Sequence, residues 1–261
     1  RRMLGLASTV SSSSTPESLY SLDFDGADDF LDTGATFNTT FAGDFSISMW
    51  VKPDEGRPAS QVSLAGAVDS STDQVNINIQ ANGKLQFYLK ADNDDGYIDT
   101  NDVIFDSGVG EWTHVACTAT LNTGGNTSMK IYINGVNRTS TTSTIASSAH
   151  DDFSLSETLY IGARNTNSGQ DDFFNGKIDE FSIWDTALNE ASVQAIYNKG
   201  GQYDLTSGLS IGTGPLVAYY RMGNGLFDDK ANGVVHDQHA FGFGAELVTN
   251  GGFDADSDWT K

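Results

Sequence analysis

The sequence predicts an all-β fold, a two-sheet antiparallel sandwich with one short helix and a C-terminal extension. Apolar and polar residues alternate with a period of two in short runs such as Phe45–Met49, Val75–Ile79 and Leu85–Leu89. This period places one face of a strand on a core and the other face in water. The chain also holds 28 Gly and 28 Asp but only 7 Glu, and Gly and Asp favour turns over helices.

The strands are expected to follow one another from about residue 18 to residue 185. Asn82-Gly83 separates two alternating runs, which is the strongest short-range signal for a β-hairpin. Because the strands are short and no helix intervenes, they are expected to pair antiparallel in two packed sheets. Further strands are expected at Trp112–Ala116, Ile131–Ile133, Leu159–Ile161 and Phe181–Trp184.

One helix is predicted over residues 189–199. Asn189 is a suitable N-cap residue, because its side chain can accept a hydrogen bond from a backbone N–H of the first turn. Val193, Ile196 and Tyr197 share one face of this helix. Gly200-Gly201 ends it,.

The N-terminal segment, residues 1–17, is rich in Ser and Thr. Such a segment cannot bury enough apolar surface to offset the entropy lost when it becomes ordered. It is therefore either a flexible tail or an assembly arm that orders against a partner subunit, with Leu4 and Leu6 as its anchors.

The C-terminal segment, residues 202–261, is a glycine-rich extension of the predicted sandwich (18–201). It contains one strong strand, Leu216–Met222. Residues 247–253 read like the beginning of a further β module.

The formal net charge of −21 excludes some classes of partner. Binding nucleic acid or anionic lipid requires clustered Lys and Arg, and no apolar run reaches the roughly 18 residues of a membrane span. Cys117 is the only cysteine, so an internal disulfide and a cysteine-based zinc site are excluded. Its place in an alternating apolar run favours a small core residue over a reactive thiol.

Five short motifs follow one another along the predicted sandwich: Phe24–Phe30, Phe45–Pro53, Trp112–Ala116, Ile131–Gly135 and Gly176–Trp184. In this order they resemble the motifs of laminin-G-like domains of the concanavalin A-like lectin/glucanase superfamily, and the resemblance covers residues 20–200. It implies a jelly-roll sandwich. Residues 1–7 and 216–223 carry a looser resemblance to virion proteins of marine bacteriophages.

The candidate catalytic residues do not form a known constellation. Retaining glucanases of the resembling superfamily need two closely spaced Glu on one strand, with carboxyl groups about 5 Å apart, and no two of the seven Glu stand that close in sequence. His114 lies within a strand, which favours a core or cross-strand histidine over a catalytic one. His236 and His239 lack a third zinc ligand. We expect a protein that is not an enzyme.

A structural calcium site is implied by the resemblance, in which the first and last strands run side by side and a calcium ion bridges them. Asp25, Asp28 and Asp179 would supply carboxylates and Gly26 a backbone carbonyl, which are the hard oxygen ligands that Ca²⁺ takes. A cation would also relieve the mutual repulsion of these acids. The alternative is that these are solvated turn aspartates, with Asp179 making local hydrogen bonds.

A second acidic segment, residues 92–102, resembles an EF-hand loop in part. Its candidate ligands are Asn93, Asp95, Asp99 and Asp102, but its first position is Ala91 and no helices flank it,. We interpret it as a hairpin loop between Leu85–Lys90 and Val103–Phe105.

Aromatic residues are the candidates for contact with a ligand or a neighbouring subunit, because lectins stack sugars on aromatic rings. Phe173 and Phe174 follow two aspartates in a polar segment and either fold under it as local core or contact a ligand. The candidates are Tyr88, Tyr97, Tyr132, Phe173 and Phe174.

Two functions from different classes remain open. The first is a non-enzymatic virion-surface subunit (decoration, fibre or tail-associated) that displays a lectin-like sandwich and belongs to an oligomer with other assembly subunits. The second is a calcium-dependent carbohydrate-binding adhesin of a bacterial surface or secreted protein. Both place the chain on a virion surface or outside the cell, and both allow glycans as ligands.

Overall fold

The computed structural model confirms the predicted fold class. Leu4, Leu6 and Asn93 lie outside the described residues, as does the side chain of Asp95. The described residues are 20–69, 73–91, 94–106, 108, 110–121, 127–140, 153–200, 204–206, 215–226, 228–229, 234–239, 247–249 and 259–260.

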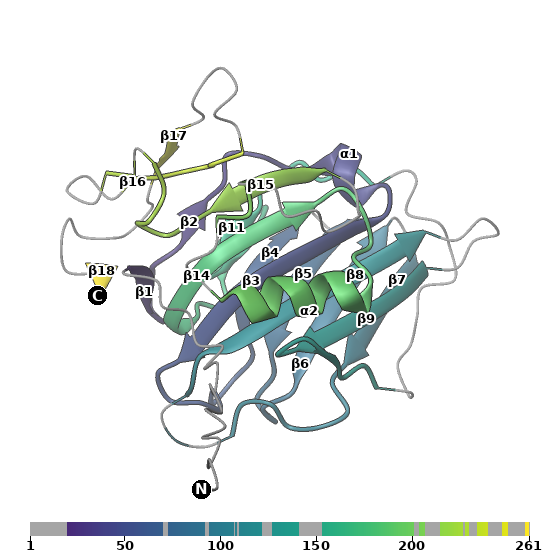
Figure 1. The fold of residues 1–261 in the computed structure, drawn as a ribbon, viewed down its shortest axis with the longest axis horizontal. Coiled ribbons are helices and arrows are strands. Elements are labelled where there is room, and N and C mark those ends of the chain that lie inside the picture. The colour runs from purple at the N-terminus through teal and green to yellow at the C-terminus, as the bar shows by residue number, and fades with distance from the viewer. Residues whose placement is uncertain are drawn as a thin grey trace, which may run out of the picture.

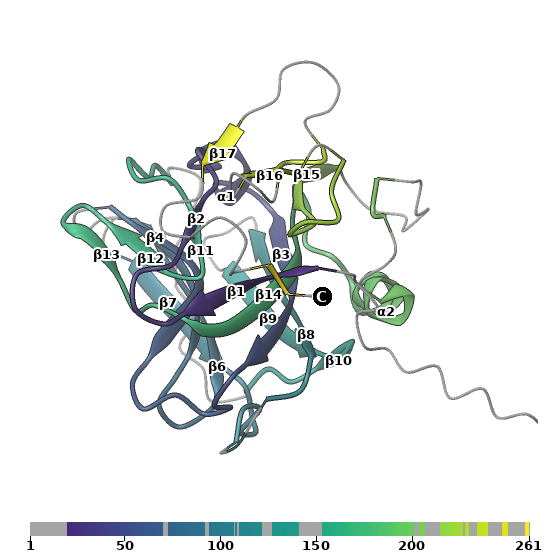
Figure 2. The ribbon, with the colours of Figure 1, turned by 90° about the vertical axis from the view of Figure 1, so that its left-hand side faces the viewer.

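Two sheets pack face to face (Figures 1 and 2). The strand order of the first sheet is β10 (Val136–Asn137), β9 (Thr127–Ile133), β8 (Thr113–Leu121), β3 (Phe45–Pro53), β14 (Asn175–Trp184), β1 (Ser21–Asp25) and β18 (Trp259–Thr260). In addition, β15 (Leu216–Tyr220) pairs with β14. The strand order of the second sheet is β13 (Gly169–Asp171), β12 (Arg164–Thr166), β4 (Val62–Val68), β5 (Gln74–Ile79), β6 (Leu85–Ala91) and β7 (Asp94–Asp99). In addition, β11 (Tyr160–Ile161) pairs with β4, and β2 (Leu31–Asp32) pairs with β11.

The remaining described elements are small. They are the helices α1 (Asn38–Phe41) and α2 (Glu190–Lys199) and a two-stranded sheet of β16 (Val234–His236) and β17 (Leu247–Thr249). No helix among the described residues is long and apolar enough to cross a membrane.

The core lies between the two sheets and is built from the alternate apolar positions that predicted the strands. Phe45 of β3 and Phe87 of β6 meet edge to face across the sandwich, with ring centroids 6.0 Å apart,. Cys117 is fully buried in the same core. This burial raises the pKa of its thiol, as expected of a small core residue rather than a reactive one,.

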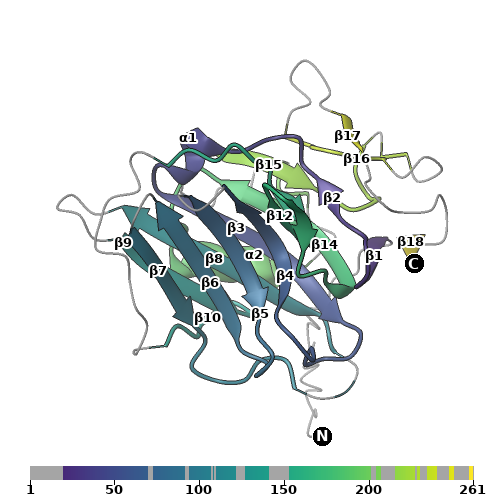
Figure 3. The same ribbon diagram turned by 180° about the vertical axis from the view of Figure 1, so that it is seen from behind.

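Helix α2 covers the outer face of the first sheet (Figure 2). It starts as predicted, because the Oδ1 atom of Asn189 accepts a hydrogen bond from the backbone N–H of Ser192 at 2.9 Å,. Val193 and Ile196 pack on Trp184 in a second apolar cluster outside the main core. No described element covers the outer face of the second sheet, which faces the viewer in Figure 3.

The C-terminal extension contributes a strand to the sandwich, and β14 has a different neighbour along each of its halves. Residues 175–178 pair with β1, whereas residues 181–184 pair with β15. Glu180 lies between these halves with a φ of 51°, at an irregularity in the pairing of β14 with β3. A positive φ is uncommon for a residue with a side chain, so this junction is a strained point of the sheet.

Candidate ligand-binding site at the rim

A pocket of about 190 Å³ opens at one end of the sandwich. It lies where β1 ends, β3 ends and β14 begins, so its walls come from strands that the sheet register holds together. Asp25, Glu55 and Asn175 give it a polar side, and Phe173 gives it an aromatic one. A mixture of aromatic and convergent polar groups is typical of small-molecule sites.

Three carboxylates gather at the edge of this rim pocket. Asp25, Asp28 and Asp29 each offer an oxygen, and these oxygens all lie within 4.8 Å of one another. We call them the rim carboxylates. Asp29 is buried, whereas Asp25 and Asp28 are exposed, so the cluster is open to solvent on one side.

Local hydrogen bonds fix the shape of this turn. The Oδ1 atom of Asp25 accepts backbone N–H bonds from Ala27 at 2.7 Å and from Asp28 at 3.3 Å. The Oδ2 atom of Asp29 accepts the backbone N–H of Asp25 at 2.9 Å. Gly26 has a φ of 75°, which a residue with a side chain rarely adopts,.

The rim carboxylates fit a calcium ion. Calcium–oxygen distances are about 2.4 Å, so two ligands on opposite sides of one ion lie about 4.8 Å apart. The oxygens here meet that limit, and carboxylates held this close repel one another unless a cation or a proton intervenes.

Asp179 does not join the rim carboxylates, contrary to the ligand set that the resemblance implied. The register pairs Asp25 with Asn175 and Leu22 with Ile178, which places Asp179 about 13 Å away along the strands. The two strands do run side by side, but their antiparallel direction carries each later residue of β14 away from Asp25. Asp179 is buried, and its Oδ1 atom accepts the backbone N–H of Glu180 at 2.8 Å. The structure brings Asp29 into the cluster instead.

The hairpin-loop interpretation of residues 92–102 is wrong, because Asp94–Asp99 form strand β7 on β6. Successive side chains of a strand point to opposite faces, so this segment does not wrap around an ion as an EF-hand loop does. Asp99 accepts a hydrogen bond from Gln86 at 3.1 Å, and Asp102 pairs with Arg138 at 3.5 Å.

The five candidate aromatic residues divide into buried and accessible ones. Tyr132 is buried in the apolar cluster under α2. Phe174 is buried in the core against Phe24 and forms part of the wall of the rim pocket. Phe173 is partly exposed and lines the rim pocket. Tyr88 and Tyr97 stack on the outer face of the second sheet.

His114 is a core residue, as the sequence favoured. It is fully buried, and its Nε2 atom lies 2.9 Å from the Oγ atom of Ser48. Burial lowers its pKa to about 3, so the imidazole is neutral at physiological pH.

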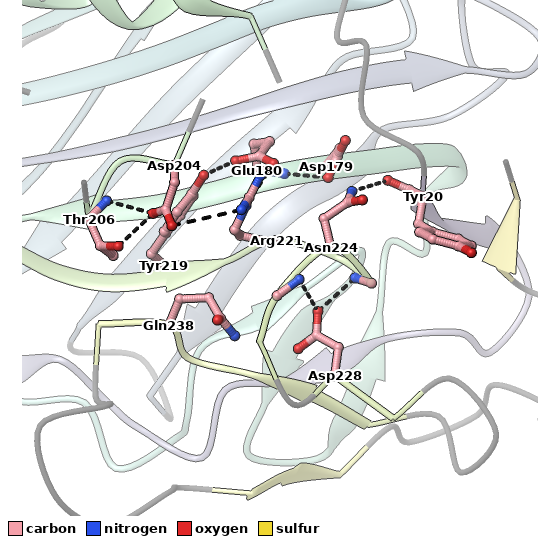
Figure 4. Close-up of polar contacts among 12 residues, drawn as sticks. Tyr20, Asp179, Glu180, Asp204, Thr206, Tyr219, Arg221, Asn224, Asp228 and Gln238 are labelled. Carbon is pink, nitrogen blue, oxygen red and sulfur yellow. Dashed lines mark hydrogen bonds and ion pairs between the residues drawn. The ribbon is translucent and has the colours of Figure 1, made fainter. Parts of the chain in front are cut away.

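One buried polar network was missed by the sequence analysis. Glu180 accepts one hydrogen bond from the Tyr219 hydroxyl and another from Nε of Arg221 at 3.3 Å (Figure 4). Arg221 also lies 3.9 Å from Asp204. Burial raises the pKa of Glu180 to about 8, because it outweighs the opposing effect of Arg221,. Since Glu180 is only 5% exposed, the network ties β15 to β14 rather than presenting an acid to solvent.

The family follows from a match over most of the sandwich. A model of the concanavalin A-like lectin/glucanases superfamily matches residues 25–194. The chain belongs to this superfamily. No curated protein matches the chain.

Two solved structures share the fold of this superfamily member. A putative carbohydrate binding protein from Bacteroides ovatus is 18% identical, with a TM-score of 0.54 over 90% of this chain and 58% of that chain. The CBM40 of the Ruminococcus gnavus IT-sialidase, bound to α2,3-sialyllactose, is 13% identical, with a TM-score of 0.52 over 68% of this chain and 96% of that chain. At these identities the likeness concerns the fold alone.

Proposed function

We propose that this chain is a non-enzymatic lectin-like module that binds a glycan in the rim pocket, beside a calcium ion held by the rim carboxylates. The observation that carries the proposal is the meeting of a pocket of about 190 Å³ with three carboxylates whose oxygens lie within 4.8 Å. When bound, calcium supplies coordination positions that sugar hydroxyl oxygens can take. Phe173 would stack on the apolar face of a sugar ring.

The two fold relatives support a glycan as the ligand, since one is a putative carbohydrate binding protein and the other was solved with sialyllactose. The states of two buried titratable side chains support a binding role over catalysis. His114 is buried and neutral, and Glu180 is held by Tyr219 and Arg221.

The proposal also concerns the assembly in which this module works. The sequence favours a subunit of a virion surface, attached by its N-terminal arm or its C-terminal extension, over a bacterial surface or secreted adhesin. Light scattering after size exclusion tests this choice, because an assembly subunit should form a symmetric oligomer and a stand-alone adhesin should be a monomer.

The calcium site is tested by differential scanning calorimetry of protein stripped with a chelator. We expect added Ca²⁺ to raise Tm, because an ion that binds only the folded state stabilises it by about 2.7 kcal/mol at a hundredfold excess over Kd. Asp28→Asn should abolish this rise, since Asp28 is an exposed member of the cluster. Asp102→Asn is the matched control, because Asp102 is exposed and lies outside the cluster.

The ligand is tested on a glycan array with and without Ca²⁺. Binding that requires Ca²⁺ and disappears in the Phe173→Ala and Asp28→Asn variants supports the proposal. A Tm that does not respond to Ca²⁺, together with no calcium-dependent glycan binding, contradicts it.

A further inference from the structure

The sandwich takes one of its strands from outside the region that the superfamily model matches. That match covers residues 25–194, whereas β15 comes later in the chain and pairs with residues 181–184 of β14. Ala218 and Tyr220 of β15 are buried in the main core, and Tyr219 is buried in the cluster under α2. Without β15 this edge of β14 would present unpaired backbone groups beside apolar side chains, so a strand has to cover it.

A buried ion pair marks the place of β15 on this edge. Glu180 lies where the partner of β14 changes from β1 to β15, and it accepts hydrogen bonds from the Tyr219 hydroxyl and from Nε of Arg221 (Figure 4). The side chains of Glu180 and Arg221 are only 5% and 15% exposed. We call Glu180 and the edge formed by residues 181–184 the socket.

This ion pair specifies the partner of the socket more than it stabilises the contact. Removing water from both charges opposes their attraction, so the best-supported role of such a pair is to fix register or partner. Glu180 also has a φ of 51°, a conformation that costs free energy in a residue with a side chain,. Both costs offset part of the apolar contact that β15 makes, which brings an open state within reach.

The segment that carries β15 is held together by hydrogen bonds of its own. The carboxylate of Asp228 accepts the backbone N–H of Gly225 at 2.9 Å and that of His236 at 2.8 Å (Figure 4). The backbone N–H of Gln238 donates to the carbonyl oxygen of Tyr219 at 2.7 Å. These bonds tie the residues after β15 back onto the strand, so β15 can leave and enter a socket as part of a larger folded piece.

The connection to this piece is long enough for it to serve either of two sockets. Leu205 is packed in the cluster under α2, and residues 207–215 lead from there toward β15. Nine residues span up to about 30 Å when extended. Farther along, Trp259 of β18 pairs with Leu22 of β1. We call residues 216–261 the extension arm, because two of its strands lie on strand edges of the first sheet.

We propose that the extension arm is exchangeable, so that β15 of one copy occupies the socket of a second copy and joins the two within an oligomer. The partner is a second copy because the socket already accepts this sequence, and Arg221 meets Glu180 in the same way between chains as within one. The proposal rests on the assembly part of the proposed function and involves neither calcium nor a glycan.

The density of subunits decides which socket the arm fills. In dilute solution a short connection holds the arm near its own socket at an effective concentration in the millimolar range, so the closed monomer is favoured. Subunits packed side by side in an assembly reach comparable local concentrations. Exchange therefore competes with closure where the chain is assembled.

Two full-length variants with reversed charges test the exchange. Glu180→Arg and Arg221→Glu each bring like charges together, so each arm should leave its own socket. In a mixture of the two, every arm meets the opposite charge in the socket of the other variant. We expect native mass spectrometry to detect a 1:1 complex that neither variant forms alone. Chymotrypsin should cut at Tyr219 and Tyr220 about tenfold more slowly in the mixture, because cleavage follows the population of the open arm.

Two controls accompany this mixture. A chain that carries both Glu180→Arg and Arg221→Glu should close on itself and match the wild type in mass and in protection from chymotrypsin. The matched control is a mixture of Arg138→Asp with Asp102→Arg. These residues form an exposed ion pair at 3.5 Å within the sandwich, so exchange of the arm cannot reunite them.

The wild type provides a measurement that needs no substitution, in case the reversed charges unfold the chain. It is refolded from urea at about 1 mM and at about 1 μM chain. We expect a discrete dimer only at the higher concentration. This dimer should persist after dilution, because two exchanged arms separate only when both sockets open.

The outcomes separate this proposal from the function proposed above. A complex in the reversed pair that exceeds the control pair, with protected arms, supports exchange. Exchange is overturned if the two pairs form equal amounts of complex or if either single variant keeps its arm protected. Where the variants do not fold, a wild type without a persistent dimer overturns it. An oligomeric wild type without arm exchange leaves the assembly role to another surface, and glycan or Ca²⁺ binding is unaffected by either result.

Discussion

The buried histidine predicts that this protein loses stability in mild acid. His114 has a pKa of about 3 in the folded state, against an ordinary value of 6.5, because burial disfavours its charged form,. A folded-state pKa that is lowered in this way means that the unfolded chain binds the proton first. The contribution of the neutral imidazole is therefore complete above about pH 6.5 and is lost progressively as the pH falls toward 3.

The size of the effect follows from the two pKa values. Each pH unit between them is worth about 1.4 kcal/mol, so lowering the pH from 7 to about 4.5 should cost about 3 kcal/mol. His114→Gln removes the titration and can still reach Ser48, although it loses the ring that packs against Trp50 with centroids 5.2 Å apart. We expect this variant to be less stable at pH 7 but to lose about 3 kcal/mol less than the wild type on acidification.

Urea denaturation followed by tryptophan fluorescence at several pH values measures both quantities. His239→Gln is the control, because His239 is exposed. If the wild type and His114→Gln lose the same free energy of unfolding between pH 7 and about 4.5, then His114 is not held neutral by burial and the reasoning fails.

Three further substitutions test other parts of the structure. Glu180→Gln should flatten the pH dependence of stability between pH 6 and 9. The folded-state pKa of about 8 lies above the ordinary 4.5, so the wild type loses stability as the pH rises from about 4.5 to about 8,, and urea denaturation at pH 6 and 9 would show the difference. Phe174→Ala should cost about 3–5 kcal/mol of unfolding free energy because it empties a core position,; an equal cost from Phe173→Ala would contradict their different burial. Asn189→Ala should cost about 1 kcal/mol by removing the cap of α2,, and a stability unchanged within error in the same urea measurement would show that the cap is not formed.

The strands and the helix cap could be predicted from the sequence because each depends on neighbouring residues. Period-two alternation predicted β3, β5 and β6, and Asn189 marked the start of α2 before any tertiary contact was known. The acidic run from residue 94 was harder, since its many aspartates indicate a turn, whereas pairing with β6 makes it a strand,. In that segment tertiary pairing overrides local propensity.

The candidate site was predicted only in part because it depends on register. Asp25 and Asp28 belong to one turn, so local sequence was enough to bring them together. Placing Asp179 required the register between β1 and β14, which lie about 150 residues apart in sequence, and no local pattern fixes that register,. The Glu180 network was missed for the same reason. Tyr219 lies on β15 and Arg221 follows the end of that strand, and no local pattern shows that β15 pairs with β14.

The strands on the two outer faces of the sandwich differ, however, in how their apolar and polar residues alternate. In β3 the side chains of both faces are almost all buried, and β8 carries the small Ala116 on its outer face, where α2 packs. In β6 buried and partly exposed side chains alternate, with Gln86, Tyr88 and Lys90 outside. Strands that are apolar on both faces need a cover, and strands that alternate cleanly keep one face for solvent or a ligand. The alternation in β6 therefore indicates that its outer side chains are accessible, whereas β4 and β5 of the same sheet are buried on both faces.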